Sequence, residues 1–289
     1  MRKAFLQLHI AVLLAGVTGI LGRLITLNEG MLVWWRLLIS SATMWILFSF
    51  LKKLQKISTA DKWKIVGVGC IAAMHWVSFF GSIKYSNVSV GLVCFSAVGF
   101  FTALLEPIIV GRKFSAIELL LGLMVMAGIY IIFHFDPQYK TGILMGLVSA
   151  MLGAIFPILN KQLLQKTNPE TLMSWELSGG LLGLSVMLPF YLQLSPTTHY
   201  LPTWEDLGWL LVLSWLCSVW AFQLSANALK KISAFTVNLS YNLEPVYGIL
   251  LAFVIYKENE LLGYSFYLGL FLILLAVALQ TLRVYQKRA

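Results

Sequence analysis

A single carboxyl group stands inside an apolar stretch in the last quarter of the chain. Residues 238–253 read NLSYNLEPVYGILLAF, so that Glu244 is followed directly by Pro245. A charged side chain at the centre of a bilayer costs about 2.5–3.5 kcal/mol on insertion scales. Protonation or a nearby cation reduces this cost. The pattern therefore favours a proton-coupling or ligand-binding role for Glu244, with hydrogen-bonded packing of a bent helix as the alternative.

Polar residues accompany this carboxyl at helical spacing. Asn238, Tyr241 and Asn242 lie on or near the face of Pro245. Proline has no N–H to donate, so the carbonyl of Tyr241 is expected to lose its helical partner. The three side chains are candidates either to satisfy that carbonyl or to bind a ligand.

Further candidates come from other apolar segments of the chain. His75 is the one histidine at the centre of such a segment, and it is a candidate to line a cavity or to transfer protons, with a hydrogen-bonded packing role as the alternative. Trp76, Trp220 and Gln223 could form an aromatic wall with one polar group, or pack as ordinary helix residues. Arg36 could contact an anion at a cavity mouth, or extend to the headgroups while its aliphatic stem stays in the lipid.

The sequence shows no pattern typical of an enzyme. Cys70, Cys94 and Cys217 lie in apolar segments without paired spacing. A glycine-rich phosphate loop and a His/Cys metal spacing are both missing from the sequence. We therefore expect neither catalysis nor a bound metal or cofactor.

The elements that must position these residues are membrane spans. Hydrophobic residues make up 59% of the 289 positions and charged residues 11%, less than half the usual share in soluble domains. The apolar residues form blocks of about 20, the length that crosses the hydrocarbon core. We predict an all-α integral membrane protein with ten spans, at residues 4–22, 32–51, 63–83, 88–110, 117–135, 142–161, 172–192, 206–229, 234–256 and 262–282.

The net charge of +9 is explained by topology rather than by nucleic-acid binding. If the N-terminus is cytoplasmic, sixteen of the 21 Lys and Arg residues fall on the cytoplasmic side. Such asymmetry is typical of multi-pass membrane proteins. We expect both termini in the cytoplasm and the protein in the cell membrane, either a plasma membrane or a bacterial inner membrane.

The chain also repeats itself. Residues 76–113 align with 222–259 at an offset of 146 in span length and loop position. Each half, 1–138 and 139–289, then has five spans, so the second half enters the membrane inverted. The alignment places Gly99 opposite Pro245, and both are candidate hinges. Inverted repeats with paired irregularities at mid-membrane are typical of secondary transporters.

Loop charges agree with the inversion. The lysine-rich loop at 52–64 corresponds to 193–205, which has no lysine. The basic pair Arg112-Lys113 corresponds to the mixed sequence Lys257-Glu258-Asn-Glu260. Corresponding loops have thus exchanged their charge, as expected when they face opposite compartments.

Taken together, these features resemble the EamA branch of the drug/metabolite transporter superfamily. The resemblance covers nearly the whole chain and rests on the layout and on Ala228, Leu229, Ser233, Ala234, Pro245 and Lys257-Glu258 in the second half, with Tyr85, Ser86, Val88 and Ser89 in the first. The sequence departs from the family pattern at Gly99, where proline is usual, and at Arg112, where an acid is usual.

The resemblance implies an alternating-access carrier that exports or exchanges small organic metabolites such as amino acids. Its partners would be that solute, the lipid bilayer and, as a further candidate, protons, with the protein a monomer or homodimer. Two alternatives stay open. One is flipping of lipids or lipid-linked sugars, and the other is a scaffold or sensor that transports nothing.

Acids near span ends are assigned to structure. Glu118, Glu170 and Asp206 are expected to cap helix starts. Glu106 is expected to pair with Arg112 or Lys113, and Glu176 with Lys161 or Lys166.

Overall fold

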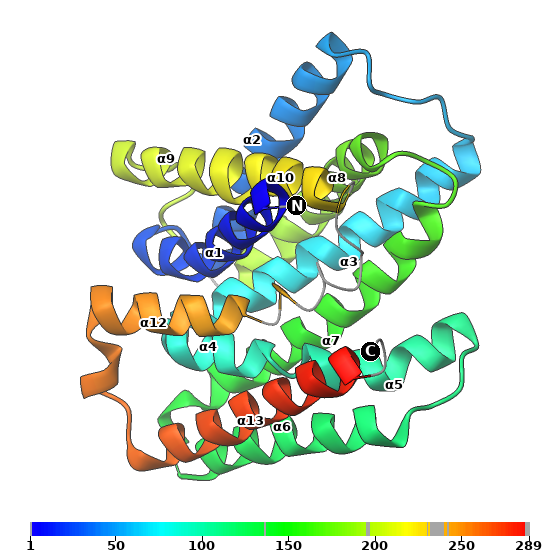
Figure 1. Cartoon of the computed structure of the whole chain (residues 1–289). Coiled ribbons are helices and arrows are strands. Elements are labelled where there is room, and N and C mark those ends of the chain that lie inside the picture. The colour runs from blue at the N-terminus through cyan, green and yellow to red at the C-terminus, as the bar shows by residue number, and fades with distance from the viewer. Residues whose placement is uncertain are drawn as a thin grey trace.

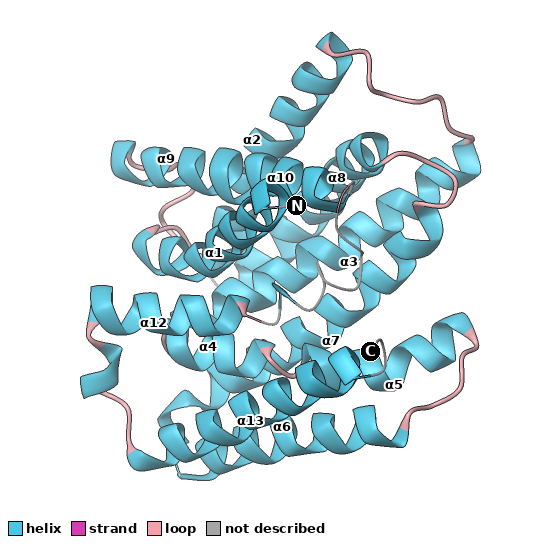
Figure 2. Cartoon of the chain, viewed as in Figure 1, coloured by secondary structure: helices cyan, strands magenta, loops and turns pink. Residues whose placement is uncertain are grey.

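The computed structural model describes residues 2–135, 137–194, 197–229, 231, 240–241 and 243–286. Within these residues the regular secondary structure is helical, and Figure 2 shows no strand there. Asn238 and Asn242, two of the predicted site residues, lie outside the described residues.

The helices follow the predicted order of spans. The first half contains α1 (Arg2–Leu24), α2 (Glu29–Phe50), α3 (Thr59–Lys84), α4 (Val88–Phe95), α5 (Val98–Val110) and α6 (Ala116–Phe135). After the short 3₁₀-helix η1 (Pro137–Tyr139), the second half contains α7 (Lys140–Leu163), α8 (Pro169–Leu194), α9 (Trp204–Leu211), the π-helix η2 (Val212–Trp220), α10 (Ala221–Leu229), α12 (Glu244–Tyr256), the 3₁₀-helix η3 (Glu258–Glu260) and α13 (Tyr264–Gln286).

The prediction of an all-α membrane protein with about ten spans is confirmed. Among the described residues, nine helical segments are long and apolar enough to cross a bilayer, and α12 is a shorter apolar helix. In Figure 1 the loops after α2 and α5 lie at one end of the bundle, and the turn after α12 lies at the opposite end.

The two halves pack reciprocally. α3 packs on α7, and its counterpart α10 packs on α1. α5 packs on α7, and its counterpart α12 packs on α1. α2 contacts α8, and α6 contacts α13 (Figure 1), so each helix meets its own counterpart. This pattern is the one that a pseudo-two-fold axis relating two five-span units produces.

The repeat is reproduced residue by residue in two half-length helices. α5 and α12 each contain 13 residues and begin 146 residues apart, at Val98 and Glu244. Each is followed by a residue in the left-handed conformation, Gly111 with φ 76° and Lys257 with φ 52°. The fourth span of the first half is therefore interrupted at Ser96–Ala97, and a helix of the second half begins at the matching place.

The two hinge candidates occupy matching positions. Gly99 and Pro245 are each the second residue of a half-helix. In the first turn of a helix an N–H has no intrahelical acceptor, so proline fits there without the loss of a hydrogen bond.

Candidate functional site

A cavity of about 580 Å³ lies between the two halves. Its walls come from α4 and α5, from α6, from α7 and α13, and from Tyr241 and Pro245 near the start of α12. Gly99 is also part of the wall. Both half-helices thus contribute their N-terminal residues to one cavity, which is large enough for a small organic solute.

Charged groups gather at one end of this cavity. Arg112 pairs with Glu106 at 3.0 Å and with Glu118 at 2.9 Å. Lys161 lies 3.5 Å from Glu106, and Arg283 lies 3.6 Å from Glu118. Burial by itself would lower the pKa of Arg112. The hydrogen bonds and charges of Glu118 and Glu106 outweigh that effect, so the pKa lies above its ordinary value.

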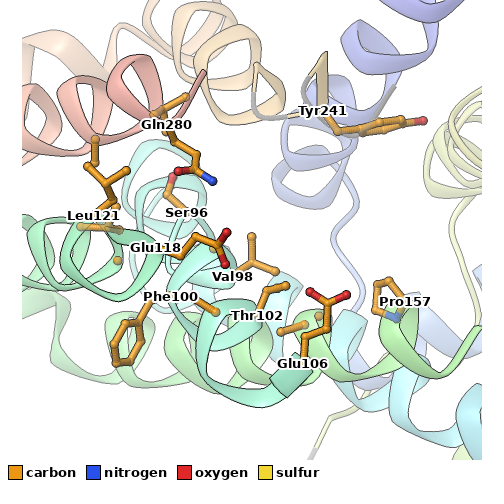
Figure 3. A pocket seen from close by; sticks show the side chains of 18 of the residues that line it. Ser96, Val98, Phe100, Thr102, Glu106, Glu118, Leu121, Pro157, Tyr241 and Gln280 are labelled. Carbon is orange, nitrogen blue, oxygen red and sulfur yellow. The ribbon is translucent and has the colours of Figure 1, made fainter. Parts of the chain in front are cut away.

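Figure 3 shows how polar side chains meet in this region. The carboxylates of Glu106 and Glu118 and the side-chain amide of Gln280 point into the same space, from α5, α6 and α13. The basic loops that follow α2 and α5 lie at this same end of the bundle.

At the opposite end of the bundle, Glu258 joins the two halves. This carboxylate is fully buried and accepts hydrogen bonds from the backbone N–H groups of Val88, at 3.0 Å, and Ser89, at 2.8 Å. Its partner Arg23 lies 2.5 Å away and stacks over Tyr256. Glu258 follows α12 in the second half, whereas Val88 and Ser89 begin α4 in the first, so the contact joins the two halves at the N-terminus of a helix, where negative charge is favoured.

Other contacts strengthen the same end. Asp206 forms the predicted capping box with Thr203 and also accepts two hydrogen bonds from Thr26, each 2.7 Å long. Lys84 donates to the carbonyl of Ile25 at 2.8 Å. The loop between α1 and α2 is thereby tied to both α3 and α9.

Arg36 is buried rather than extended to the membrane surface. Only 6% of the residue is exposed, and its Nε and Nη2 donate to Ser218 Oγ at 3.2 and 3.1 Å. The guanidinium lies over the ring of Trp76, 4.5 Å from its centroid. Nη1 has no hydrogen-bond partner among the described residues. This placement does not fit a side chain that reaches the headgroups.

Glu244 lies at the N-terminus of α12, next to the cavity residue Pro245. The charges of Glu244 and Arg36 interact electrostatically across the two halves. Yet no ion pair within 4.0 Å joins them in the described part of the chain. The two opposite charges are therefore near each other but not in contact.

His75 is a packing residue beside the cavity in this conformation. Its Nδ1 lies 2.9 Å from the carbonyl oxygen of Ser149 and 3.0 Å from the hydroxyl of the same residue. The ring is surrounded by Phe79, Phe95 and Phe156. Phe95 lies between His75 and the cavity, since it lines the wall and its ring centroid is 5.3 Å from that of the imidazole.

The remaining predicted residues are distributed differently. Tyr241 lines the cavity, and its hydroxyl lies 2.6 Å from that of Ser225 on α10. Trp220 is 45% exposed, and neither Trp220 nor Trp76 is among the residues that line the cavity. Gln223 lies half-buried on α10.

Sequence reasoning underestimated the acids at the charged end. Glu106 does pair with Arg112, as predicted, but both residues also line the cavity. The prediction for Glu176 was wrong, because its buried carboxylate accepts a hydrogen bond from Asn160 at 2.7 Å rather than pairing with a lysine. Two acids on either side of Arg112, at adjoining ends of neighbouring helices, were the signal that could have identified this end of the cavity.

Metal-ligating side chains are scattered in the described part of the chain. No group of three or more His, Cys, Asp or Glu side chains there could hold a metal ion.

The architecture has relatives among known proteins. The model of the EamA-like transporter family matches residues 2–134 and 140–282, one match in each half. A solved structure described as "Crystal structure of protein" is similar in fold, with a TM-score of 0.65, 15% sequence identity and 100% of both chains covered. No curated protein sequence matches the chain.

Proposed function

The chain belongs to the EamA-like transporter family, whose members are membrane transporters of the drug/metabolite transporter superfamily, and on this premise we propose that it is a secondary carrier for small organic metabolites such as amino acids. Residues 1–138 and 139–289 are the two five-span units that move against each other. The solute leaves the cytoplasm, or exchanges across the membrane, through the cavity between them.

One observation carries this proposal. The cavity lies between the two halves among charged groups at the end assigned to the cytoplasm, while Glu258 and Asp206 close the opposite end. Such asymmetry is what an inward-open state of an alternating-access carrier requires. A scaffold has no need for a cavity whose wall includes the broken helices of both halves.

Glu244 is the proposed coupling residue. It is an acid that adjoins Pro245 of the cavity wall, and its charge interacts with that of Arg36. The N-terminus of α12 partly stabilises its anionic form. A group that changes charge beside the transport path can link solute movement to a proton gradient.

A matched pair of glycine variants tests the proposal. A side chain added at Gly99 or at Gly67 meets no atom within 4 Å of its Cβ, but only Gly99 belongs to the cavity wall. Gly99→Trp should therefore fill the cavity and abolish transport, whereas Gly67→Trp should leave it unchanged.

The readout is untargeted mass spectrometry of metabolites inside and outside cells that express the wild type, either variant or an empty vector. We expect a set of small solutes to change distribution with the wild type and with Gly67→Trp, but not with Gly99→Trp. Identical metabolite pools for wild type and vector would instead favour the scaffold alternative. A change confined to lipids would favour the flippase alternative.

A further inference from the structure

Arg36 keeps an open hydrogen-bond donor deep in the bundle. A guanidinium has five N–H donors, and Ser218 engages only those of Nε and Nη2. Nη1 is buried and has no partner among the described residues. A buried charged donor without a partner is strongly destabilising unless some other group satisfies it. Nη1 of Arg36 therefore needs a hydrogen-bond acceptor that the described residues do not supply.

The surroundings hold the guanidinium in a fixed orientation. Ser218 donates its hydroxyl proton to the carbonyl of Leu213 at 3.0 Å, which leaves its lone pairs for Arg36. Ser214 contacts the backbone carbonyl of Arg36 at 3.4 Å. Leu213, Ser214 and Ser218 all belong to the π-helix η2, and π-helical turns occur frequently at functional sites. The guanidinium also lies over the ring of Trp76.

We propose that Nη1 of Arg36 binds a carboxylate group of the transported solute. This inference rests on the proposed carrier function and names the chemical class that the carrier accepts. Glu244 connects the cavity wall to this site, because it adjoins Pro245 of the wall and interacts electrostatically with Arg36.

The charge balance favours a single carboxylate. Arg36 supplies one positive charge, and a monoanion neutralises it. A phosphate monoester would bring up to two negative charges into a site with one cation, and the excess would be costly in a medium of low dielectric constant. Arginine also matches the planar geometry of a carboxylate.

Glu244 makes the site sensitive to protons. The charged and titratable groups that act on this pair are Arg36 on α2, His75 on α3, Cys217 on η2 and Tyr241 before α12. When Glu244 is ionised, it balances Arg36 and repels a second anion. When Glu244 is protonated, Arg36 requires another anion, so the proton and the solute carboxylate bind with positive cooperativity.

The test extends the metabolite measurement to three further variants. Arg36→Gln removes the charge, Arg36→Lys keeps it without the planar fork, and Ser218→Ala keeps the guanidinium but removes its anchor. We expect Arg36→Gln to reduce transport of carboxylate-bearing solutes at least tenfold, as expected for the loss of a charge-assisted hydrogen bond. Arg36→Lys should retain part of the flux, and Ser218→Ala should raise KM severalfold with little change in kcat.

The outcomes separate this inference from the proposed function. If the wild type moves solutes that carry no carboxylate, or moves phosphate esters, the carrier function stands and the Arg36 assignment is overturned. The same holds if carboxylate solutes are moved equally well by Arg36→Gln. If the wild type moves no solute, the carrier proposal itself fails. If Arg36→Gln does not accumulate in the membrane, the KM and kcat of Ser218→Ala and Arg36→Lys decide, and unchanged KM values in both overturn the assignment.

Discussion

Replacing Glu258 by glutamine should open the end of the bundle that the proposed topology places outside the cell, here called the outer end. The change keeps the size and shape of the side chain and removes its charge. In the closed state the carboxylate is fully buried and accepts hydrogen bonds from the backbone N–H groups of Val88 and Ser89. A glutamine has one acceptor oxygen, so its NH₂ group must face one of these donors or Arg23.

The magnitude follows from the hydrogen bonds that the substitution breaks or weakens. Hydrogen bonds to charged groups contribute about 1.5–3 kcal/mol each, so one broken and one weakened bond amount to about 3 kcal/mol. The ion pair with Arg23 adds little, because that side chain is 38% exposed and its charge is screened by solvent. A loss of about 3 kcal/mol corresponds to a shift of about 100-fold in the equilibrium between closed and open outer ends.

A cysteine at position 89 reports on this equilibrium. Ser89 is fully buried beneath Glu258, and its hydroxyl has no hydrogen-bond partner among the described residues, so Ser89→Cys removes no hydrogen bond of the side chain. In a background with the native cysteines replaced by alanine, a membrane-impermeant maleimide is added from outside the cell. Labelling should be slow with Glu258 present and up to about 100-fold faster with Glu258→Gln.

Glu260→Gln is the matched control. Glu260 lies on the same 3₁₀-helix but is exposed, so the same chemical change there should leave the labelling rate unaltered. Equal rates for Glu258→Gln and the parent would refute the reasoning that this carboxylate holds the outer end closed.

Three further results are expected. Glu244→Gln should flatten the dependence of solute flux on pH between about 5 and 8, because the residue that exchanges the proton is gone; an unchanged profile in proteoliposomes would remove Glu244 from the coupling role. Pro245→Ala should change the free energy of unfolding by less than about 1 kcal/mol, since the first turn of a helix needs no N–H at this position; a large loss of thermal stability in detergent would show that the proline does more than begin α12. Asp206→Ala should lower stability by about 2–3 kcal/mol through loss of the capping box and of both bonds to Thr26; an unaltered melting temperature would contradict that.

Much of the fold could be predicted from the sequence because the bilayer imposes strong rules. Span length and the exclusion of charge from hydrocarbon predicted the helices within a few residues, apart from the start of span 234–256, most of which lies outside the described residues. The offset of 146 between the halves reappears in the start of α5 at Val98 and of α12 at Glu244. The sequence pattern was sufficient to predict span positions and the repeat, because the bilayer imposes the same rule along the whole chain.

The site was less accessible to this reasoning, because it depends on contacts between distant segments. Nothing in the local sequence of Arg36 indicates that Ser218, 182 residues away, holds its guanidinium inside the bundle. Likewise, the sequence indicates only that Glu258 is an acid in a loop. Its contact with the start of α4 depends on the folded arrangement of the two halves. Trp220 is a large aromatic residue of the type that often lines a binding site, yet it ends η2 with 45% of its surface exposed and does not line the cavity.

Accessibility of position 99 from the two sides of the membrane tests the central claim most directly. In Gly99→Cys, with the native cysteines replaced, the new thiol lies in the cavity wall, and a membrane-impermeant maleimide is applied to right-side-out and to inside-out vesicles. An alternating-access carrier in the state described here should react rapidly from the cytoplasmic side and slowly from outside, and combination with Glu258→Gln should reverse that preference. Reaction from neither side, or from the outside in both backgrounds, would contradict a cavity that opens to one compartment at a time.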